Sequence, residues 1–130
     1  MARVATPAVF RQIESLFDGG SIAGMTDRQL LERFTTGGDA TGEVAFAALV
    51  RRHGPMVLGI CHQLVGDRHH AEDVFQAVFL VLARKAHSIR DPELLGNWLY
   101  GVTLRAARKA RVRMLSRRKL AGASLRRGAR

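Results

Sequence analysis

The last third of the chain carries residues whose types and spacing are suited to binding a nucleic acid. Asn97, Gly101, Arg105 and Arg108 follow at steps of four, four and three, which on an α-helix places an amide and two guanidinium groups on one face. Such a face binds phosphates and contacts bases. A merely solvated charged face is the alternative, but no Asp or Glu follows Glu93 to supply the usual ion-pair partners.

Two aromatic residues of this segment are interpreted differently. Trp98 falls within the apolar stripe and is expected in the core rather than as a base-stacking platform. Tyr100 lies nearer the polar face, where a ring can stack on an unpaired base. The candidate DNA-binding residues are therefore Asn97, Tyr100, Arg105, Arg108 and Lys109.

A second candidate surface lies on the segment from Ala71 to Lys85. Its apolar stripe leaves Asp73, Gln76 and Leu80 together on another helix face. Phe79, Leu80 and Val81 add more apolar surface than one buried stripe requires. An acid and an amide beside exposed apolar groups are typical of a protein-binding surface. A helix buried on two sides of a small bundle remains the alternative. The candidate partner-binding residues are Asp73, Gln76 and Leu80.

The charge of the chain is strongly asymmetric. Eleven Lys or Arg lie between Arg105 and Arg130, whereas residues 1–93 carry ten bases and eleven acids, a balance of about −1. The whole chain has a formal net charge of +10. These numbers indicate a near-neutral body with a cationic last third, and a polyanionic partner, with nucleic acid first and an anionic membrane surface second.

Motifs for catalysis or metal binding are missing from the sequence. It contains no HExxH pattern, no phosphate-binding glycine loop and no nucleophile elbow, and no two of its five His are four residues apart. Cys61, the only cysteine, is expected to be simply buried and favours a reducing compartment. We therefore expect a protein that is not an enzyme and has no cofactor or metal site.

The apolar periodicity predicts an all-α protein without strands. Thr26 with Gln29 forms a capping-box spacing, and Asp67 is a plausible N-cap for a helix that ends near Lys85. The predicted helices are 7–18, one from Thr26, one from Val44, one opened by Pro55, one from Asp67, and one from Asp91-Pro92 that buries Leu95, Trp98, Leu99, Val102 and Ala106.

The two ends of the chain and its hydropathy give expectations about disorder and location. Residues 117–130 are rich in Arg, Ala and Gly and are expected to be disordered without a partner. No run of signal-peptide length occurs near the start, and no stretch comes close to the eighteen or so apolar residues that span a bilayer, so a cytoplasmic location without a membrane is expected.

Three ordered pieces of sequence resemble a known family. They are AFAALVRRHGPMVLGIC at 45–61, GD with AEDVFQAVFLVL at 66–82, and NWLYGVTLRAARKAR at 97–111. In order and spacing, the run from Asp27 to about Arg113 resembles the second conserved region of extracytoplasmic-function (ECF) RNA polymerase sigma factors. The resemblance implies a small helical bundle over residues 26–115. An N-terminal helical extension and linker at 1–25 and a basic flexible tail at 116–130 would flank it.

The resemblance also implies partners and roles. Asp73 and Gln76 stand at the positions where the family's helix docks on the coiled-coil clamp of the beta-prime subunit of core RNA polymerase. The loop at Ala86 to Asp91 and the following helix would engage the promoter minus-ten element and capture a flipped base of the non-template strand, with Asn97, Arg105 and Arg108 on that side. An anti-sigma factor is a further partner.

The sequence departs from the family in one respect and leaves two alternatives open. Nothing that resembles the second sigma domain, a helix-turn-helix, follows residue 115 of this chain. A clamp-binding decoy without initiation activity, or a general basic nucleic-acid-binding helical protein, would share the same surfaces. The helix expected at 7–18 has no role assigned by the resemblance.

Overall fold

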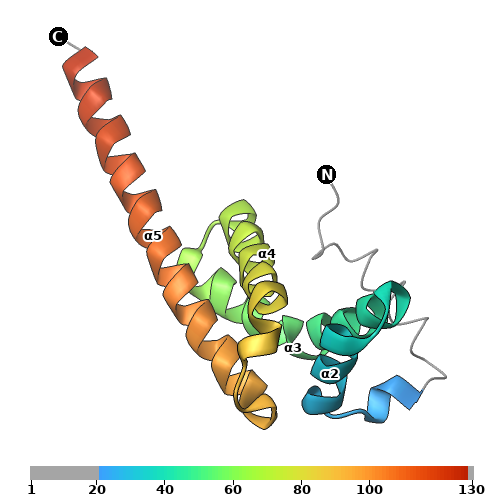
Figure 1. Cartoon of the computed structure of the whole chain (residues 1–130). Helices are drawn as coiled ribbons and strands as arrows, with labels where there is room; N and C mark the ends of the chain where they lie inside the picture. The colour runs from blue at the N-terminus through green and yellow to red at the C-terminus, as the bar shows by residue number, and fades with distance from the viewer. Residues whose placement is uncertain (1–20, 129–130) are drawn as a thin grey trace.

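The computed structural model describes residues 21–128, and these residues form helices and no strands, which confirms the all-α prediction. In chain order they are η1 (Ser21–Gly24), α2 (Asp27–Thr36), α3 (Asp39–Val65), α4 (Arg68–Lys85), η2 (Ala86–Ser88), η3 (Pro92–Leu94) and α5 (Leu95–Gly128). Helix α3 contacts α2, α4 and α5, and α4 also contacts α5 (Figure 1). The helix predicted at residues 7–18 lies outside the described residues.

The helix starts that depend on local side-chain chemistry agree with the predictions. The Gln29 backbone N–H donates to Thr26 Oγ1 at 3.2 Å, and the Thr26 backbone N–H donates to Gln29 Oε1 at 2.9 Å, so the capping box of α2 is complete. At the start of α4, Asp67 Oδ2 accepts from the His70 backbone N–H at 2.9 Å. These bonds satisfy amide groups that the first helical turn leaves without partners.

The predicted helix boundary at Gly54-Pro55 is wrong, because α3 continues through both residues. Pro55 lacks the N–H that would bond to the preceding turn, which costs about 3 kcal/mol within a helix. On either side of it, Val50, Val57 and Cys61 are almost completely buried. The burial of apolar residues in both halves of α3 offsets the local cost.

Helix α3 is also more apolar than the sequence-based expectation allowed. Its 27 residues include an 18-residue window with a mean hydropathy of 1.3, so by length and composition alone it meets the criterion for a membrane-spanning helix. The expectation that no segment comes close to the length and apolar composition of a membrane-spanning helix is therefore wrong. A core helix meets the same criterion, and α3 packs against the other three long helices.

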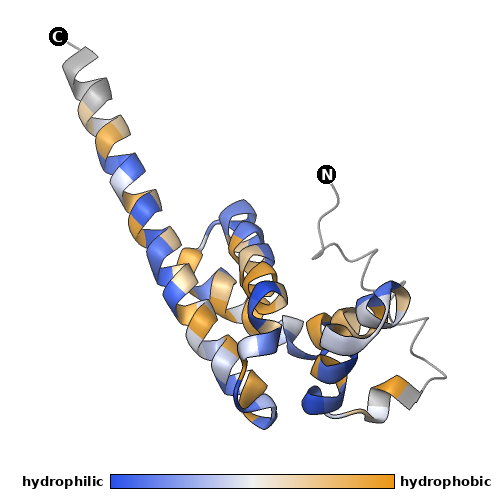
Figure 2. Cartoon of the chain, in the orientation of Figure 1, coloured by the Kyte–Doolittle hydropathy of each residue, from blue (hydrophilic) through white to orange (hydrophobic). Residues whose placement is uncertain are grey.

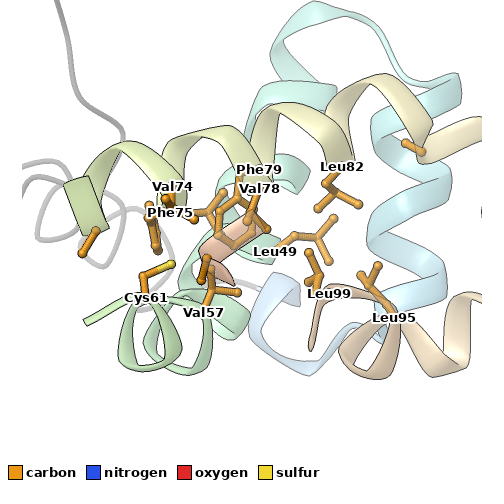
Figure 3. Close-up of a cluster of buried hydrophobic side chains, with 14 of the residues drawn as sticks. Leu49, Val57, Cys61, Val74, Phe75, Val78, Phe79, Leu82, Leu95 and Leu99 are labelled. Atoms are coloured by element: carbon orange, nitrogen blue, oxygen red, sulfur yellow. The ribbon is translucent and has the colours of Figure 1, made fainter. Parts of the chain in front are cut away.

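The core lies where α3, α4 and the first part of α5 meet (Figure 3). Phe75 is fully buried, and its ring centroid lies 5.0 Å from that of Phe79, which contacts Phe46 of α3 edge-on at 6.5 Å. Cys61 is completely buried, as predicted, and burial raises the pKa of its thiol to about 11. Buried aromatic rings in such arrangements add to the stability that their buried area provides.

The first half of α5 buries a different stripe from the predicted one. Leu95 and Leu99 are buried as expected, but Thr103 and Ala107 take the next core positions, while Trp98, Val102 and Ala106 are half-buried. The Thr103 hydroxyl donates to the Leu99 carbonyl at 2.6 Å, so its polar group has a partner inside the core. The α-helix itself begins at Leu95, after the single 3-10 turn that contains Pro92, and the Asp91 side chain does not cap that turn.

The tail expected to be disordered is helical as far as Gly128. Arg, Lys, Leu and Ala are among the strongest helix formers, and residues 115–121 are all exposed, so helix propensity rather than packing accounts for the continuation. Helix α5 therefore passes without a break across the predicted domain boundary at 115/116, and its last part extends away from the bundle (Figure 1).

Candidate functional site

The outer face of α4 carries the three residues proposed to bind a protein partner. Asp73 is exposed, Gln76 is half-buried and Leu80 is 58% exposed. Their spacing of three and four residues places them on the side of the helix opposite Val78, which is fully buried. The exposure of Asp73 and Leu80 argues against the alternative of a helix buried on two sides within the described chain.

The apolar surplus on α4 is smaller than the sequence suggested. Phe79 belongs to the core rather than to the outer face, and Val81 is half-buried toward α5. At one edge of the outer face, Asp73 shares an open pocket of about 260 Å³ with Arg113 and Arg117 of α5. The outer face therefore combines one large exposed apolar side chain, an amide and an acid, and is bordered by cations.

A pocket of about 500 Å³ opens where the α4–α5 connection meets the start of α5. Its lining comes from two segments: Ser88, Ile89, Arg90, Asp91, Leu94, Asn97 and Trp98. Apolar walls lie beside a guanidinium, a carboxylate and an amide, which is the mixture that a flat, polar-edged aromatic ligand such as a nucleobase requires.

A second open pocket, of about 340 Å³, continues on the other side of Trp98, between α4 and α5. Val81, Val102 and Ala106 give it an apolar floor, and its cationic groups are those of Lys85, Arg105 and Lys109. Trp98 is half-buried and lines both pockets. We call the two pockets together the Trp98 groove.

The predicted DNA-binding residues divide into two groups. Asn97, Arg105 and Lys109 line the Trp98 groove, whereas Tyr100, which is 50% exposed, and Arg108 lie on the surface of α5 outside it. The Arg105 guanidinium lies close to Gly101, since a Cβ built there would be in ordinary van der Waals contact, at 3.4 Å, with a terminal nitrogen of Arg105.

Sequence reasoning missed Trp98 and Lys85 as groove residues. The apolar stripe places Trp98 in the core, and the sequence gives Lys85 only as the approximate end of a helix. The signal that distinguishes them is tertiary, since Lys85 joins Arg105 and Lys109 only because α4 packs beside α5.

The acids nearest the groove, Asp91 and Glu93, form hydrogen bonds on the side of the groove that faces α2. Arg28 Nε donates to Glu93 Oε1 at 2.7 Å, and this bond holds the pKa of Glu93 below its usual value. A hydrogen bond with Glu93 raises the pKa of Asp91. The negative charge of Glu93 is thus partly neutralised by Arg28, while Asp91 lines the first pocket and the cations Lys85, Arg105 and Lys109 line the second.

A second polar cluster joins α2 to α3. The Asp27 carboxylate lies 3.0 Å from both Arg52 Nη1 and His53 Nε2. This cluster fixes the α2–α3 hairpin and lies apart from the groove residues. Among residues 21–128, no three His, Cys, Asp or Glu side chains are grouped so that they could hold a metal ion.

Comparisons with known proteins place these surfaces in a family. Residues 49–118 match the Sigma-70 region 2 family, which is more than half of the chain. The ECF RNA polymerase sigma factor SigE of Mycolicibacterium smegmatis is 25% identical over 115 residues, covering 85% of this chain and 44% of that protein. The RNA polymerase sigma-H factor of Pseudomonas aeruginosa is 30% identical over 82 residues, covering 63% of this chain and 40% of its own length.

The chain thus spans less than half the length of these two relatives. No solved structure is significantly similar to it. The matched residues 49–118 include both the outer face of α4 and the Trp98 groove. The chain belongs to the sigma-70 region 2 family, which confirms the resemblance of its sequence to region 2 of ECF sigma factors.

Proposed function

We propose that the chain acts in the cytoplasm in transcription initiation, as a binding protein rather than an enzyme. In this proposal the outer face of α4 binds core RNA polymerase at the coiled-coil clamp of its beta-prime subunit. The Trp98 groove and the neighbouring face of α5 bind the non-template strand of the promoter minus-ten element and stabilise it in the melted state.

The observation that carries the proposal is the Trp98 groove itself. Separating base pairs costs several kcal/mol, so a melting protein must bind unpaired bases and their phosphates better than it binds duplex. The groove combines an aromatic wall, apolar floors and the cations Lys85, Arg105 and Lys109. An aromatic surface for a base next to cations for its phosphates is the usual construction of a single-strand site.

The position of the α4 face supports simultaneous binding of both partners. Asp73, Gln76 and Leu80 line neither pocket of the Trp98 groove, although α4 contributes Val81 and Lys85 to it. One helix therefore presents its outer side to a protein and its α5 side to the groove. A polymerase contact on the outer side leaves the groove open to a DNA strand.

The test measures binding to core RNA polymerase first. Labelled chain is titrated with core enzyme, comparing Asp73→Ala with the matched control Glu43→Ala, which removes an exposed acid from α3. Asp73→Ala is expected to weaken binding about fivefold or more, as for an interface contact worth more than 1 kcal/mol. Glu43→Ala should leave it unchanged. No binding of the unaltered chain to core enzyme would refute the proposal.

The second stage tests DNA with the assembled complex. Non-template strands are selected from a pool randomised over the minus-ten positions, and the selected sequence is built into a pre-melted and a duplex promoter. The complex should prefer the selected strand and open the duplex, and Arg105→Ala should weaken both activities while Arg33→Ala does not. Core binding without any strand preference would favour a clamp-binding decoy instead.

A further inference from the structure

The last part of α5, beyond the Trp98 groove, has features that the proposed function does not use. We call residues 115–128 the α5 arm, because Met114 is the last α5 residue that belongs to the core. The arm extends away from the bundle, and residues 115–121 are all exposed (Figure 1). Most of the arm also follows residue 118, where the match to the family ends.

The arm carries cations on several sides. Arg117, Arg118 and Lys119 are consecutive, so on a helix they point in directions about 100° apart. No acid follows Glu93 in the sequence, so α5 itself supplies no Asp or Glu to neutralise them, although Arg117 shares a pocket with Asp73 of α4. Three cations at these positions span about 200° of the helix circumference, so the arm presents positive charge over more than half of its surface.

The distribution of apolar residues argues against a membrane surface as the partner. A helix that lies in a membrane interface segregates its apolar residues on one face. The exposed Leu115 and Leu120 are five positions apart, which places them about 140° apart around the helix. Hydrophilic and hydrophobic patches alternate along this part of α5 rather than forming one stripe (Figure 2).

The composition of the arm also argues against binding to unpaired bases. No Phe, Trp or Tyr follows Tyr100, and no Asn or Gln follows Asn97, so the arm has neither a stacking ring nor an amide for reading bases. Cations without such groups contact phosphates regardless of sequence. Duplex DNA offers the denser array, with one negative charge per about 1.7 Å of its axis.

We propose that the α5 arm is a separate, sequence-independent binding site for the phosphate backbone of double-stranded DNA. This site goes beyond the proposed function, and its test needs neither polymerase nor a promoter.

The experiment measures the affinity of the whole chain for a short labelled duplex of arbitrary sequence at 50 and 200 mM salt. The arm variant is Arg117→Gln/Arg118→Gln/Lys119→Gln. The matched control removes three exposed charges outside α5, with Arg33→Gln, Arg68→Gln and Arg84→Gln. Gln has a helix propensity close to that of Arg and Lys, and circular dichroism checks that the helices are intact.

If each of the three cations contacts one phosphate, the slope of log affinity against log salt falls by about 2.7 in the arm variant. The affinity lost between 50 and 200 mM salt is then about 40-fold smaller than for the unaltered chain. The control should keep the original slope, and a scrambled duplex should bind equally well.

Three outcomes would overturn the site. In the first, the arm variant keeps the salt slope of the unaltered chain. In the second, the salt slope of the control variant falls as much as that of the arm variant, which would show that binding depends only on net charge. In the third, the chain binds a single strand of the same length, or vesicles containing phosphatidylserine, more tightly than duplex, and this binding depends on the same three cations. A failure of the proposed function would instead be seen in binding to core polymerase or in the strand preference of the assembled complex, neither of which enters this experiment.

Discussion

Replacing Trp98 with Ala tests whether the groove binds a base or only the charges of a strand. The side chain is half-buried and lines both a pocket of about 500 Å³ and one of about 340 Å³. Its removal deletes the only aromatic side chain among the described residues that lines either pocket. If the ring stacks on an unpaired base, the loss is about 1–3 kcal/mol, which is about a 5- to 150-fold weaker complex.

The assay compares the affinity of the polymerase complex for the selected non-template strand with that for strands in which one base at a time is replaced by an abasic sugar. The strand that lacks the base stacked on Trp98 should bind the unaltered complex weakly. Trp98→Ala should not lower the affinity for that strand any further. Trp98→Phe keeps an aromatic surface and should restore most of the affinity. Leu94→Ala alters the same pocket without removing a ring and serves as the matched control.

Two results would refute the reasoning. Equal loss of affinity on the intact and abasic strands would show that Trp98 acts through folding or through phosphates alone. Full affinity of Trp98→Ala would show that no base is held against the ring. Because part of the ring packs on the core, thermal unfolding of each variant is measured first, and binding is compared at a temperature where all are folded.

Further predictions concern the fold. Phe75→Ala removes a fully buried ring and should lower the free energy of unfolding by about 3–5 kcal/mol in urea titrations, whereas Leu80→Ala, at a side chain that is 58% exposed, should change it by less than about 0.5 kcal/mol. Asp67→Ala should lower the urea midpoint relative to Asp67→Asn, which keeps a capping oxygen. Hydrogen bonds from the His70 backbone and side chain hold the pKa of Asp67 below its usual value, so its stabilising effect should be present above about pH 4 and be lost as pH falls through the lowered pKa. Burial raises the pKa of the Cys61 thiol to about 11, so Cys61 should react with thiol reagents at pH 8 only in denaturant. Its contribution to stability should be complete below about pH 9 and be lost toward pH 11, a dependence that Cys61→Ala should lack.

The features that could be predicted from the sequence are those decided by neighbouring residues. The capping box at Thr26 and the cap at Asp67 need only a side-chain oxygen and a backbone amide three positions later. The face with Asp73, Gln76 and Leu80 follows in the same way from helical periodicity within one segment. In each case the interacting groups belong to a single helix.

The features that could not be predicted depend on contacts between distant segments. Pro55 would end an isolated helix, and only the burial of Val50 and Val57 against other helices keeps α3 continuous. The half-burial of Trp98 depends on how α5 is rotated against α3 and α4, since Thr103 occupies a core position that an apolar pattern would not assign to it. The groove has the same origin, because its cations come from two helices.

The continuity of α5 links the two proposed DNA sites in a fixed geometry. Trp98 and Lys119 lie on one helix that has no Pro or Gly between Gly101 and Gly122. At 1.5 Å per residue, the 21 steps between them span about 32 Å, the length of about nine base pairs of duplex. A strand held in the groove and a duplex held on the arm are therefore separated by a constant distance. Binding at one site fixes where DNA can meet the other, so the arm favours DNA whose duplex continues for about one turn beside the melted bases.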